Sequence, residues 1–465
     1  MNLIKKIGSD KKIFAVENIF LVIALLFGIA MAFVGTPFQE ADGWEHYVRS
    51  LDVSYGNIFA PVAYINHDKG TAVVPGNFEE MNYRITAPSS GEGTAYKDYL
   101  KSIKLSKKGK IIDFHAGYAS VFYYPQAIGL FIGRILGLSV YGCVVFGKIM
   151  NLIAFLVLVY TAVKITPILK NTMIVIALFP MTIYQAASFS YDSLLNGLCF
   201  LFISLCFYYA YSDKEIISIK EVLRLGILLA FIFLCKYVYI CIGLLVFLIP
   251  KEKFGSKKEY FKKFIIALIP VLILGIFALF MAFSTFSSGQ DAVKNGVTDG
   301  NTAMTPFEFL LSNPKHVILL LIITFINKFA DYMYWLDVLG SLNYSLGPLT
   351  YIVPMFALYV IGSDVSEYGY KIKLSDKIIS LATFVITSII MVIGMYISDT
   401  RINFAGNYVV QGIQGRYFIA ILPALAFALV PRKRTNENKY FSYELLVCEF
   451  LILCFALYGL KLNCY

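Results

Sequence analysis

Residues 19–34 read IFLVIALLFGIAMAFV, a run without a single charge, and the apolar stretch extends from Phe14 to Gly35 with Glu17 as its one ionisable residue. An α-helix rises 1.5 Å per residue, so about 20 apolar residues cross about 30 Å of hydrocarbon. Inside that layer a helix also satisfies its own backbone hydrogen bonds. We therefore predict a membrane-spanning helix here.

The rest of the 465-residue chain continues this pattern, since 58% of all residues are hydrophobic and only 15% are charged. The predicted fold class is all-α: a polytopic transmembrane bundle of about 11 spans, with the N-terminus inside and a large first extracytoplasmic loop. The further spans are expected at Val140 to about Ile165, Met173–Ala187, Leu194–Tyr211, two limbs within Val222–Ile249, Phe264–Phe283, Leu349–Ile361, Ile378–Ile397, Tyr417–Val430 and Leu445–Leu460.

The net charge is +10, and the basic residues form short clusters between the apolar runs. They do not form the single basic surface that binding of nucleic acid would need. Loops rich in Lys and Arg stay on the cytoplasmic side, so these clusters indicate how the spans are oriented in the membrane. This rule decides the run 222–249. One crossing would put the six lysines of 251–263 outside, so we predict a hairpin with Lys236 at its tip. Because 123–138 carries Pro125, Gln126 and Arg134, it is expected to be interfacial rather than to cross, and parity predicts that 317–335 is re-entrant or interfacial.

These expectations divide the chain into five consecutive parts. They are the N-terminal tail and first span (1–35), an extracytoplasmic loop with an interfacial helix (36–138), a transmembrane bundle (139–284), a second extracytoplasmic loop (285–346) and a C-terminal transmembrane bundle (347–465).

The stretch after the first span, TPFQEADGWEHYVR at 36–49, is the strongest candidate for chemistry. Asp42, Glu45 and His46 are the predicted catalytic residues, and Asp42 is the choice for a general base acting on an acceptor hydroxyl. A Mg²⁺ or Mn²⁺ ion is compatible with these carboxylates, although the sequence does not require one. The alternative is an ordinary solvated acidic loop.

Other polar side chains are expected on the same outer side, and ionisable groups at the membrane are functional candidates by default. Alternatives remain open, because lysine and arginine at helix ends often only extend to the lipid headgroups and Asp192 can cap a helix. The predicted substrate-binding residues are Arg49, Asp192, Asn196, Lys236, Arg401, Gln414, Arg416 and Tyr417.

Three motifs occur in the order typical of a bacterial branch of predicted integral membrane proteins grouped with the GT-C glycosyltransferases. Pro37, Asp42, His46 and Arg49 match its first motif, residues 185–196 its second and residues 414–418 its third. The chain thus resembles this group over most of its length. One departure concerns Gly43, where the branch has a glutamate; Glu45 is the candidate substitute.

The resemblance implies a polyprenyl-phosphate-linked sugar as donor, a cell-envelope glycan or glycolipid as acceptor, and an inverting transfer. It also implies a bacterial cytoplasmic membrane with the active site on its extracytoplasmic side. Two other functions remain open. A flippase for lipid-linked saccharides would use the same basic residues without a carboxylate base, and a polysaccharide polymerase or ligase would take a diphosphate-linked donor.

Overall fold

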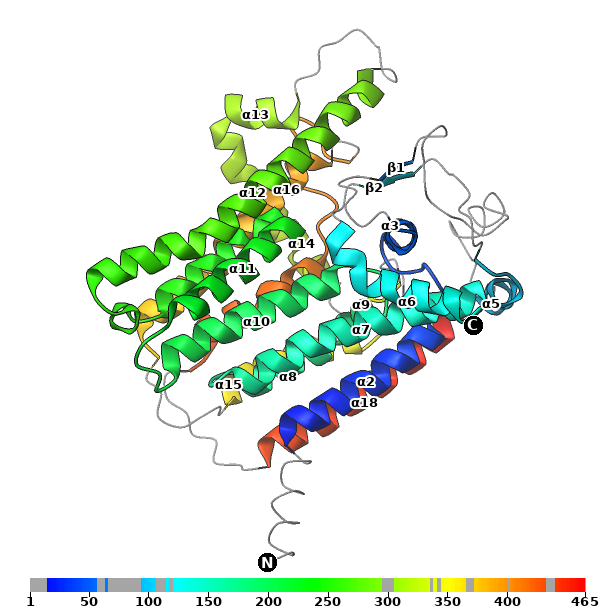
Figure 1. Cartoon of the computed structure of the whole chain (residues 1–465), viewed down its shortest axis with the longest axis horizontal. Coiled ribbons are helices and arrows are strands. Elements are labelled where there is room, and N and C mark those ends of the chain that lie inside the picture. The colour runs from blue at the N-terminus through cyan, green and yellow to red at the C-terminus, as the bar shows by residue number, and fades with distance from the viewer. Residues whose placement is uncertain are drawn as a thin grey trace, which may run out of the picture. The chain divides into compact units, whose positions relative to one another are not determined.

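The structure is a computed structural model that describes residues 15–56, 63–65, 93–105, 114–116, 120–294, 305–334, 338–340, 344–364, 372–399, 402–431 and 440–464. Apart from one pair of short strands, its elements are helices, which confirms the all-α fold class (Figure 1). Contacts divide the chain into two compact units, and the five consecutive parts expected from the sequence stay a prediction. Unit 1 comprises Met1–Leu205, Asp337–Tyr370 and Val430–Tyr465, and unit 2 comprises Cys206–Leu336 and Lys371–Leu429.

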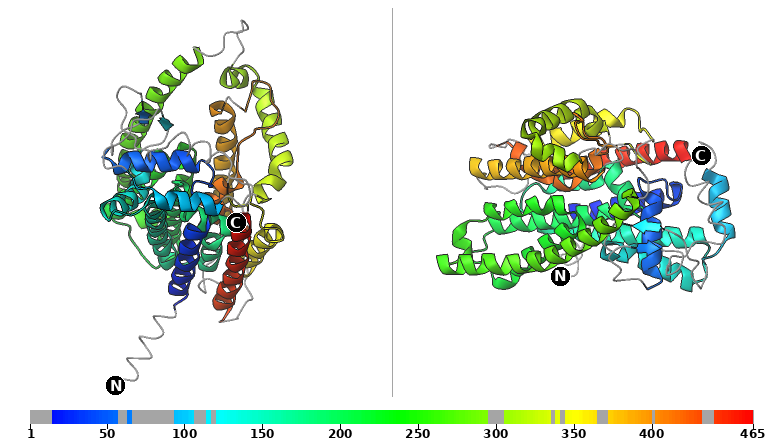
Figure 2. Two further views of the ribbon diagram at one scale, coloured as in Figure 1. Left: turned by 90° about the vertical axis from the view of Figure 1, so that its right-hand side faces the viewer. Right: turned by 90° about the horizontal axis from the view of Figure 1, so that it is seen from above.

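Unit 1 holds the first span, the elements of the loop that follows it, and the last helix. Its elements in chain order are α2 (Val16–Val34), α3 (Gly43–Ser54), β1 (Ala63–Ile65), α5 (Gly93–Ser102), β2 (Phe114–Ala116), η1 (Ser120–Tyr123), α6 (Tyr124–Ile135), α7 (Val140–Ile165), α8 (Lys170–Leu178), α9 (Pro180–Ala186), most of α10 (Asp192–Tyr211), α15 (Leu349–Ser363) and α18 (Phe441–Cys464). Strands β1 and β2 pair antiparallel. Helices α2 and α18 lie side by side (Figure 2).

Unit 2 begins within α10 and contains the central helices. Its elements are α11 (Ile219–Cys235), η2 (Tyr237–Leu248), η3 (Lys251–Phe254), α12 (Lys257–Lys294), α13 (Pro306–Ser312), α14 (Pro314–Tyr334), α16 (Leu374–Ser398), η4 (Gly415–Ile421) and α17 (Leu422–Leu429). Helices α11 and α12 pack very closely, because a Cβ at Gly226 would lie 2.2 Å from the carbonyl oxygen of Ala267.

Six described helices are long and apolar enough to cross a membrane, or seven if the bent pair α13 and α14 forms one span. The six are α2, α7, α10, α12 over Lys257–Phe277, α16 and α18. The total of about 11 therefore stays a prediction. The difference comes from shorter apolar helices, such as η2 and α15, and from the 115° bend between α13 and α14.

The expected span over 173–187 is wrong as a single helix, because the chain breaks between α8 and α9. Pro180 starts α9, and Phe179 before it is extended, with φ −49° and ψ 138°. A proline disfavours helical geometry in the preceding residue and lacks the N–H that would continue the helix. The two short helices reach the α9–α10 turn, which is part of the site described below.

The chain reverses within 222–249 as the predicted hairpin requires, while the placement of its tip at the outer face stays a prediction. Helix α11 ends at Cys235, Lys236 is extended with φ −156° and ψ 102°, and η2 begins at Tyr237. A Cβ at Gly243 would lie 2.8 Å from the Leu229 side chain, so residues equally far from Lys236 face one another. The two limbs therefore run antiparallel.

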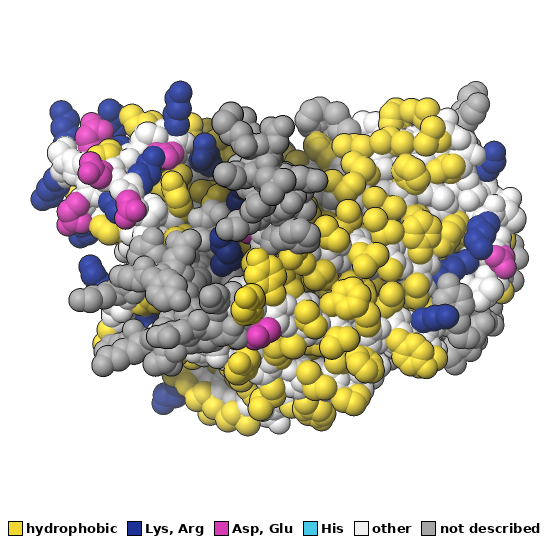
Figure 3. Space-filling model, turned by 90° about the horizontal axis from the view of Figure 1, so that it is seen from below, with side chains coloured by type: hydrophobic (Ala, Val, Ile, Leu, Met, Phe, Trp, Pro, Cys, Tyr) yellow, Lys and Arg dark blue, Asp and Glu magenta, His cyan; other side chains and the backbone are white. Residues whose placement is uncertain are grey.

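Helix α6 fits the predicted interfacial segment, because its 12 residues give a length of about 18 Å, too short to cross the hydrocarbon layer. One side packs on α3 and α7, while Ile128, Phe131 and Ile135 are exposed. More widely, exposed hydrophobic side chains cover a broad face of the molecule, and charged side chains lie mainly near its edges (Figure 3). Such apolar surface is expected of a protein solvated by lipid.

Candidate functional site

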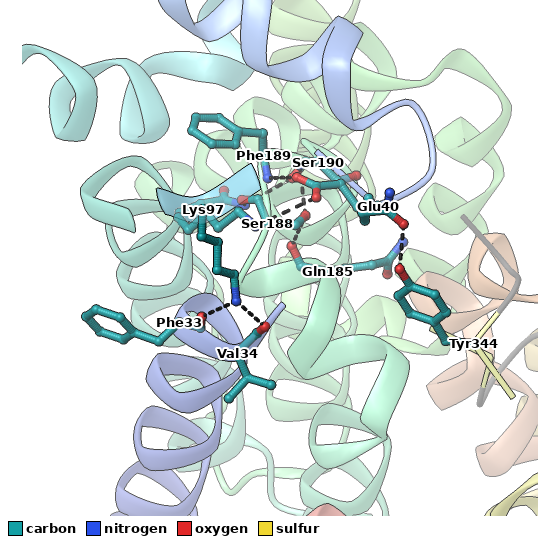
Figure 4. Close-up of polar contacts among 12 residues, drawn as sticks. Phe33, Val34, Glu40, Lys97, Gln185, Ser188, Phe189, Ser190 and Tyr344 are labelled. Atoms are coloured by element: carbon teal, nitrogen blue, oxygen red, sulfur yellow. Dashed lines mark hydrogen bonds and ion pairs between the residues drawn. The ribbon is translucent and has the colours of Figure 1, made fainter. Parts of the chain in front are cut away.

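The centre of the candidate site in unit 1 is Glu40, whose side chain is 3% exposed. Its Oε1 accepts a hydrogen bond from the backbone N–H of Phe189 at 2.9 Å. Phe189 lies in the turn between α9 and α10, so this contact joins the stretch after the first span to the second motif (Figure 4). The stretches that carry the first and second motifs therefore meet within unit 1.

Two buried polar residues of helix α7 contact Glu40 and the α9–α10 turn. The Lys148 Nζ lies 3.8 Å from Glu40 Oε2, and both side chains are almost fully buried. Asn151, one turn later, donates from Nδ2 to the carbonyls of Ser188 at 2.9 Å and Ser190 at 3.0 Å. The turn is thereby fixed from one side by Glu40 and from the other by α7.

Three buried polar atoms around this turn lack a hydrogen-bond partner among the described residues: Glu40 Oε2, Gln126 Oε1 and Gln185 Nε2. Gln126 donates from Nε2 to the Phe189 carbonyl at 3.3 Å, and Gln185 Oε1 accepts from Asn196 at 3.5 Å. Leaving buried polar groups unsatisfied is costly and uncommon. A cluster of three such atoms marks this turn as a place where a polar ligand group can be recognised.

The backbone around Glu40 is strained at two positions. Phe38 and Asp42 both have left-handed geometry, with φ 65° and φ 57°, which non-glycine residues adopt at a cost. Gly43 is required by packing, because a Cβ there would lie 2.7 Å from Glu40 Cγ and 2.8 Å from the Phe38 carbonyl oxygen. A side chain at position 43 would therefore overlap both the Glu40 side chain and the Phe38 backbone.

Helix α3 carries the other acidic and basic residues of the first motif. Asp42, immediately before it, and Glu45 in its first turn are exposed. His46 is buried, and its Nδ1 lies 2.8 Å from the Tyr123 hydroxyl. The buried Tyr47, Val48 and Leu51 anchor the helix in a hydrophobic core with residues of α5, α6 and α7.

Arg49, on the buried side of α3, is fully inaccessible and forms an ion pair with Asp52 at 3.0 Å. Burial lowers the pKa of Arg49, and the neighbouring Asp52 opposes this effect. This geometry gives Arg49 a part in holding α3 in place. Its predicted contact with substrate stays a prediction.

Lys97 of α5 fastens the same loop to the end of the first span. Its Nζ donates to the carbonyls of Phe33 at 3.0 Å and Val34 at 2.6 Å, which are acceptors left open at the C-terminus of α2 (Figure 4). A cation is favourable there because the carbonyls carry partial negative charge. Burial lowers the pKa of Lys97 to about 8, and nearby Lys148 contributes to the shift.

Asp192 and Asn196, the predicted binding residues of the second motif, are buried in the first turns of α10. The backbone N–H of Asp192 donates to Ser190 Oγ at 3.2 Å, and Asn196 contacts Gln185. Gln39, next to Glu40, accepts at Oε1 from the Tyr344 hydroxyl at 2.5 Å (Figure 4). The second motif is thus held by hydrogen bonds within the α9–α10 turn, next to the loop that carries Glu40.

Unit 2 brings together three of the predicted binding residues near the tip of its hairpin. The Lys236 Nζ lies 3.9 Å from the centre of the Tyr417 ring, and Arg416 Cζ lies 5.3 Å from the same ring. The Tyr239 hydroxyl donates to the Tyr417 carbonyl at 2.6 Å. Gln414 precedes this group, and its buried Oε1 has no hydrogen-bond partner in the described part of the chain. Arg401 lies outside the described residues.

Metal binding has no geometric support in the described ranges, where no three His, Cys, Asp or Glu side chains are placed to share an ion. His46 is engaged with Tyr123, while Asp42 and Glu45 are exposed.

Glu40 lies within the predicted acidic stretch but is not among the predicted site residues, and neither are Lys148, Asn151 and Gln126. One signal was available, because Lys148 is a charged residue within an otherwise apolar span. Gln126 and Asn151 carry no charge and therefore do not stand out in the sequence in this way.

Comparison with known proteins gives one match. A family model described as Predicted membrane protein (DUF2142) matches residues 25–425. No curated protein and no solved structure matches the chain.

Proposed function

The chain belongs to this family of predicted membrane proteins, and from that premise we propose that it is a membrane glycosyltransferase. It transfers a sugar from a polyprenyl-phosphate-linked donor to a glycan or glycolipid acceptor on the extracytoplasmic side of a bacterial cytoplasmic membrane. The observation that carries this proposal is the hydrogen bond from Phe189 to Glu40, because it joins two of the three motifs on which the resemblance rests. Motifs that meet in space, although 149 residues apart, support a shared role.

Asp42 is the proposed base. It is exposed, whereas Glu40 two residues earlier is buried and occupied by Phe189 and Lys148. Asp42 is also held in left-handed geometry, and strained backbone tends to occur at functional sites. An exposed carboxylate on a rigid support has the access that proton transfer from an incoming hydroxyl requires.

The proposed reaction is a single displacement. The acceptor hydroxyl oxygen forms a bond to the anomeric carbon as the bond from that carbon to the donor phosphate oxygen breaks. The hydroxyl proton passes to Asp42, and the polyprenyl phosphate leaves with the electron pair. Within unit 2, Lys236 and Arg416 are separately proposed to bind an anionic lipid phosphate, since charge-assisted hydrogen bonds favour an anionic group.

Transfer of labelled sugar by the purified protein in lipid nanodiscs tests the proposal. Wild type is expected to use a polyprenyl-monophosphate donor, and Asp42→Asn to lose at least a hundredfold in rate. Asp98→Asn is the matched control, because Asp98 is an exposed carboxylate of α5 that pairs with neighbouring Lys101 at 2.9 Å.

Full activity of Asp42→Asn would remove the proposed base. A preference for diphosphate donors would instead indicate a polymerase or ligase. Movement of the lipid-linked saccharide across the bilayer without sugar transfer, unaffected by Asp42→Asn, would indicate a flippase. Either result would overturn the glycosyltransferase proposal.

A further inference from the structure

An apolar cavity lies in unit 2 at the end of the hairpin away from Lys236. Its volume is about 60 Å³, room for the end of a hydrocarbon chain. The lining residues come from α11, η2, η3 and α12, and almost all are hydrophobic, among them Val246, Phe254 and Phe264. The exception is Lys251, which brings a cation to an otherwise apolar wall.

The short turn that carries Lys251 is rigidly built. Lys263 is buried and donates to the Phe254 carbonyl at 2.9 Å. Lys253 donates to the Ser212 carbonyl at 2.7 Å, and its own carbonyl accepts from the N–H of Ile217 at 2.8 Å. Two of the six lysines in 251–263 are thus used to hold the turn, which leaves the others for a different task.

The remaining lysines are exposed at the start of α12: Lys257, Lys258 and Lys262 join Lys251 there. Lys257 precedes the cavity residue Tyr260 by three positions, so it lies one turn away on the same helix face. Lys262 is partly neutralised by Glu259 at 3.5 Å. The net charge of this segment is positive, because six lysines stand against Glu252 and Glu259.

From the cavity and its cationic rim we infer a binding site for an anionic phospholipid at the membrane surface facing the lysine-rich loops. The end of one acyl chain enters the cavity between η2 and α12 while the rest of the chain lies along their apolar surface, and the headgroup phosphate lies against Lys251, Lys257 and Lys258. Lysines next to a membrane helix attract anionic lipid, and an apolar cavity open to the bilayer accepts a hydrocarbon chain. This inference is independent of the proposed transferase activity.

Lipid retention by native mass spectrometry tests the site, with the purified full-length chain exposed to equal amounts of phosphatidylglycerol and phosphatidylcholine of identical chains. Wild type is expected to retain phosphatidylglycerol preferentially. The variant Lys251→Gln/Lys257→Gln/Lys258→Gln should lose the preference by about tenfold. The matched control is Lys101→Gln/Lys104→Gln/Lys461→Gln, which removes the same charge from exposed positions of unit 1.

A second variant tests the cavity. Val246→Phe fills it and leaves all lysines in place, so it should reduce the retention of both lipids at this site while the protein stays folded by its melting temperature. The inference fails if the triple lysine variant keeps the wild-type preference, if the control loses as much, or if Val246→Phe retains phosphatidylglycerol as wild type does.

Discussion

The backbone N–H of Phe189 donates to Glu40 Oε1 over 2.9 Å, and Lys148 lies 3.8 Å from the other oxygen of the same carboxylate. One buried side chain thereby connects the loop after the first span, the α9–α10 turn and helix α7. Glu40, Lys148 and Phe189 are all buried. Removing the charge of either Glu40 or Lys148 would leave the other charge buried without a counter-ion.

Glu40→Gln is expected to destabilise the protein. The amide keeps an oxygen for Phe189 but leaves the buried Lys148 without its counter-charge, and breaking a buried pair in this way costs about 3 kcal/mol. Thermal unfolding in detergent measures the effect. Glu40→Gln/Lys148→Met should recover part of the loss, and no recovery would show that the pair is not the cause.

Gly43→Ala is expected to cost about 1–3 kcal/mol, because the new methyl group would overlap Glu40 Cγ and the Phe38 carbonyl. The melting temperature should fall, and the exposed Asp42 beside it should lose its position and reduce sugar transfer. Gly362→Ala is the control, since Gly362 of α15 has open space around its missing Cβ. Equal stability of the two variants would contradict the predicted overlap.

The Lys97 contact predicts a dependence on pH. Its pKa is lowered to about 8 in the folded protein, from 10.5, so between these values the unfolded chain binds more protons. The free energy of unfolding contributed by Lys97 therefore rises with pH across this window. The melting temperature of wild type minus that of Lys97→Met should therefore increase between pH 7.5 and pH 9.5. A gap that stays constant or shrinks would show that Lys97 does not titrate there.

Tyr417→Leu should weaken binding of a lipid-phosphate donor. The substitution removes the ring that lies 3.9 Å from Lys236 and leaves both cations less well positioned. The KM for the donor is expected to rise about threefold to tenfold, the range of a cation–π contact. Tyr351→Leu, at an exposed position of α15, serves as control. An unchanged KM would argue against a role for this ring.

Much of the fold followed from the sequence because the membrane limits the possibilities. The predicted span from Val140 to about Ile165 coincides with α7, which Ser139 caps at its start. The break at Lys236 followed from the positions of lysines alone. The break at Pro180 was not predicted, because the apolar run over 173–187 has no polar interruption and suggests one continuous helix.

The site was only partly predictable. Asp42, Glu45 and His46 are candidates because they follow the end of the first span. Their position in the sequence does not distinguish the exposed Asp42 and Glu45 from the buried Glu40. Burial depends on which distant turn packs against the loop, here residues 188–190. The clash that makes Gly43 necessary likewise arises from the folded path of the loop and is invisible in a linear motif.

The hairpin at Lys236 also shows why a count of residues understates how far a chain can reach. The 12 residues of η2 rise about 2.0 Å each in a 3-10 helix and extend about 24 Å, whereas the 17 residues of α11 rise about 1.5 Å each and extend about 25 Å. The outward and return limbs are therefore equal in length. The Ile217 N–H donates to the Lys253 carbonyl at 2.8 Å, so the chain leaves the hairpin beside the point where it entered.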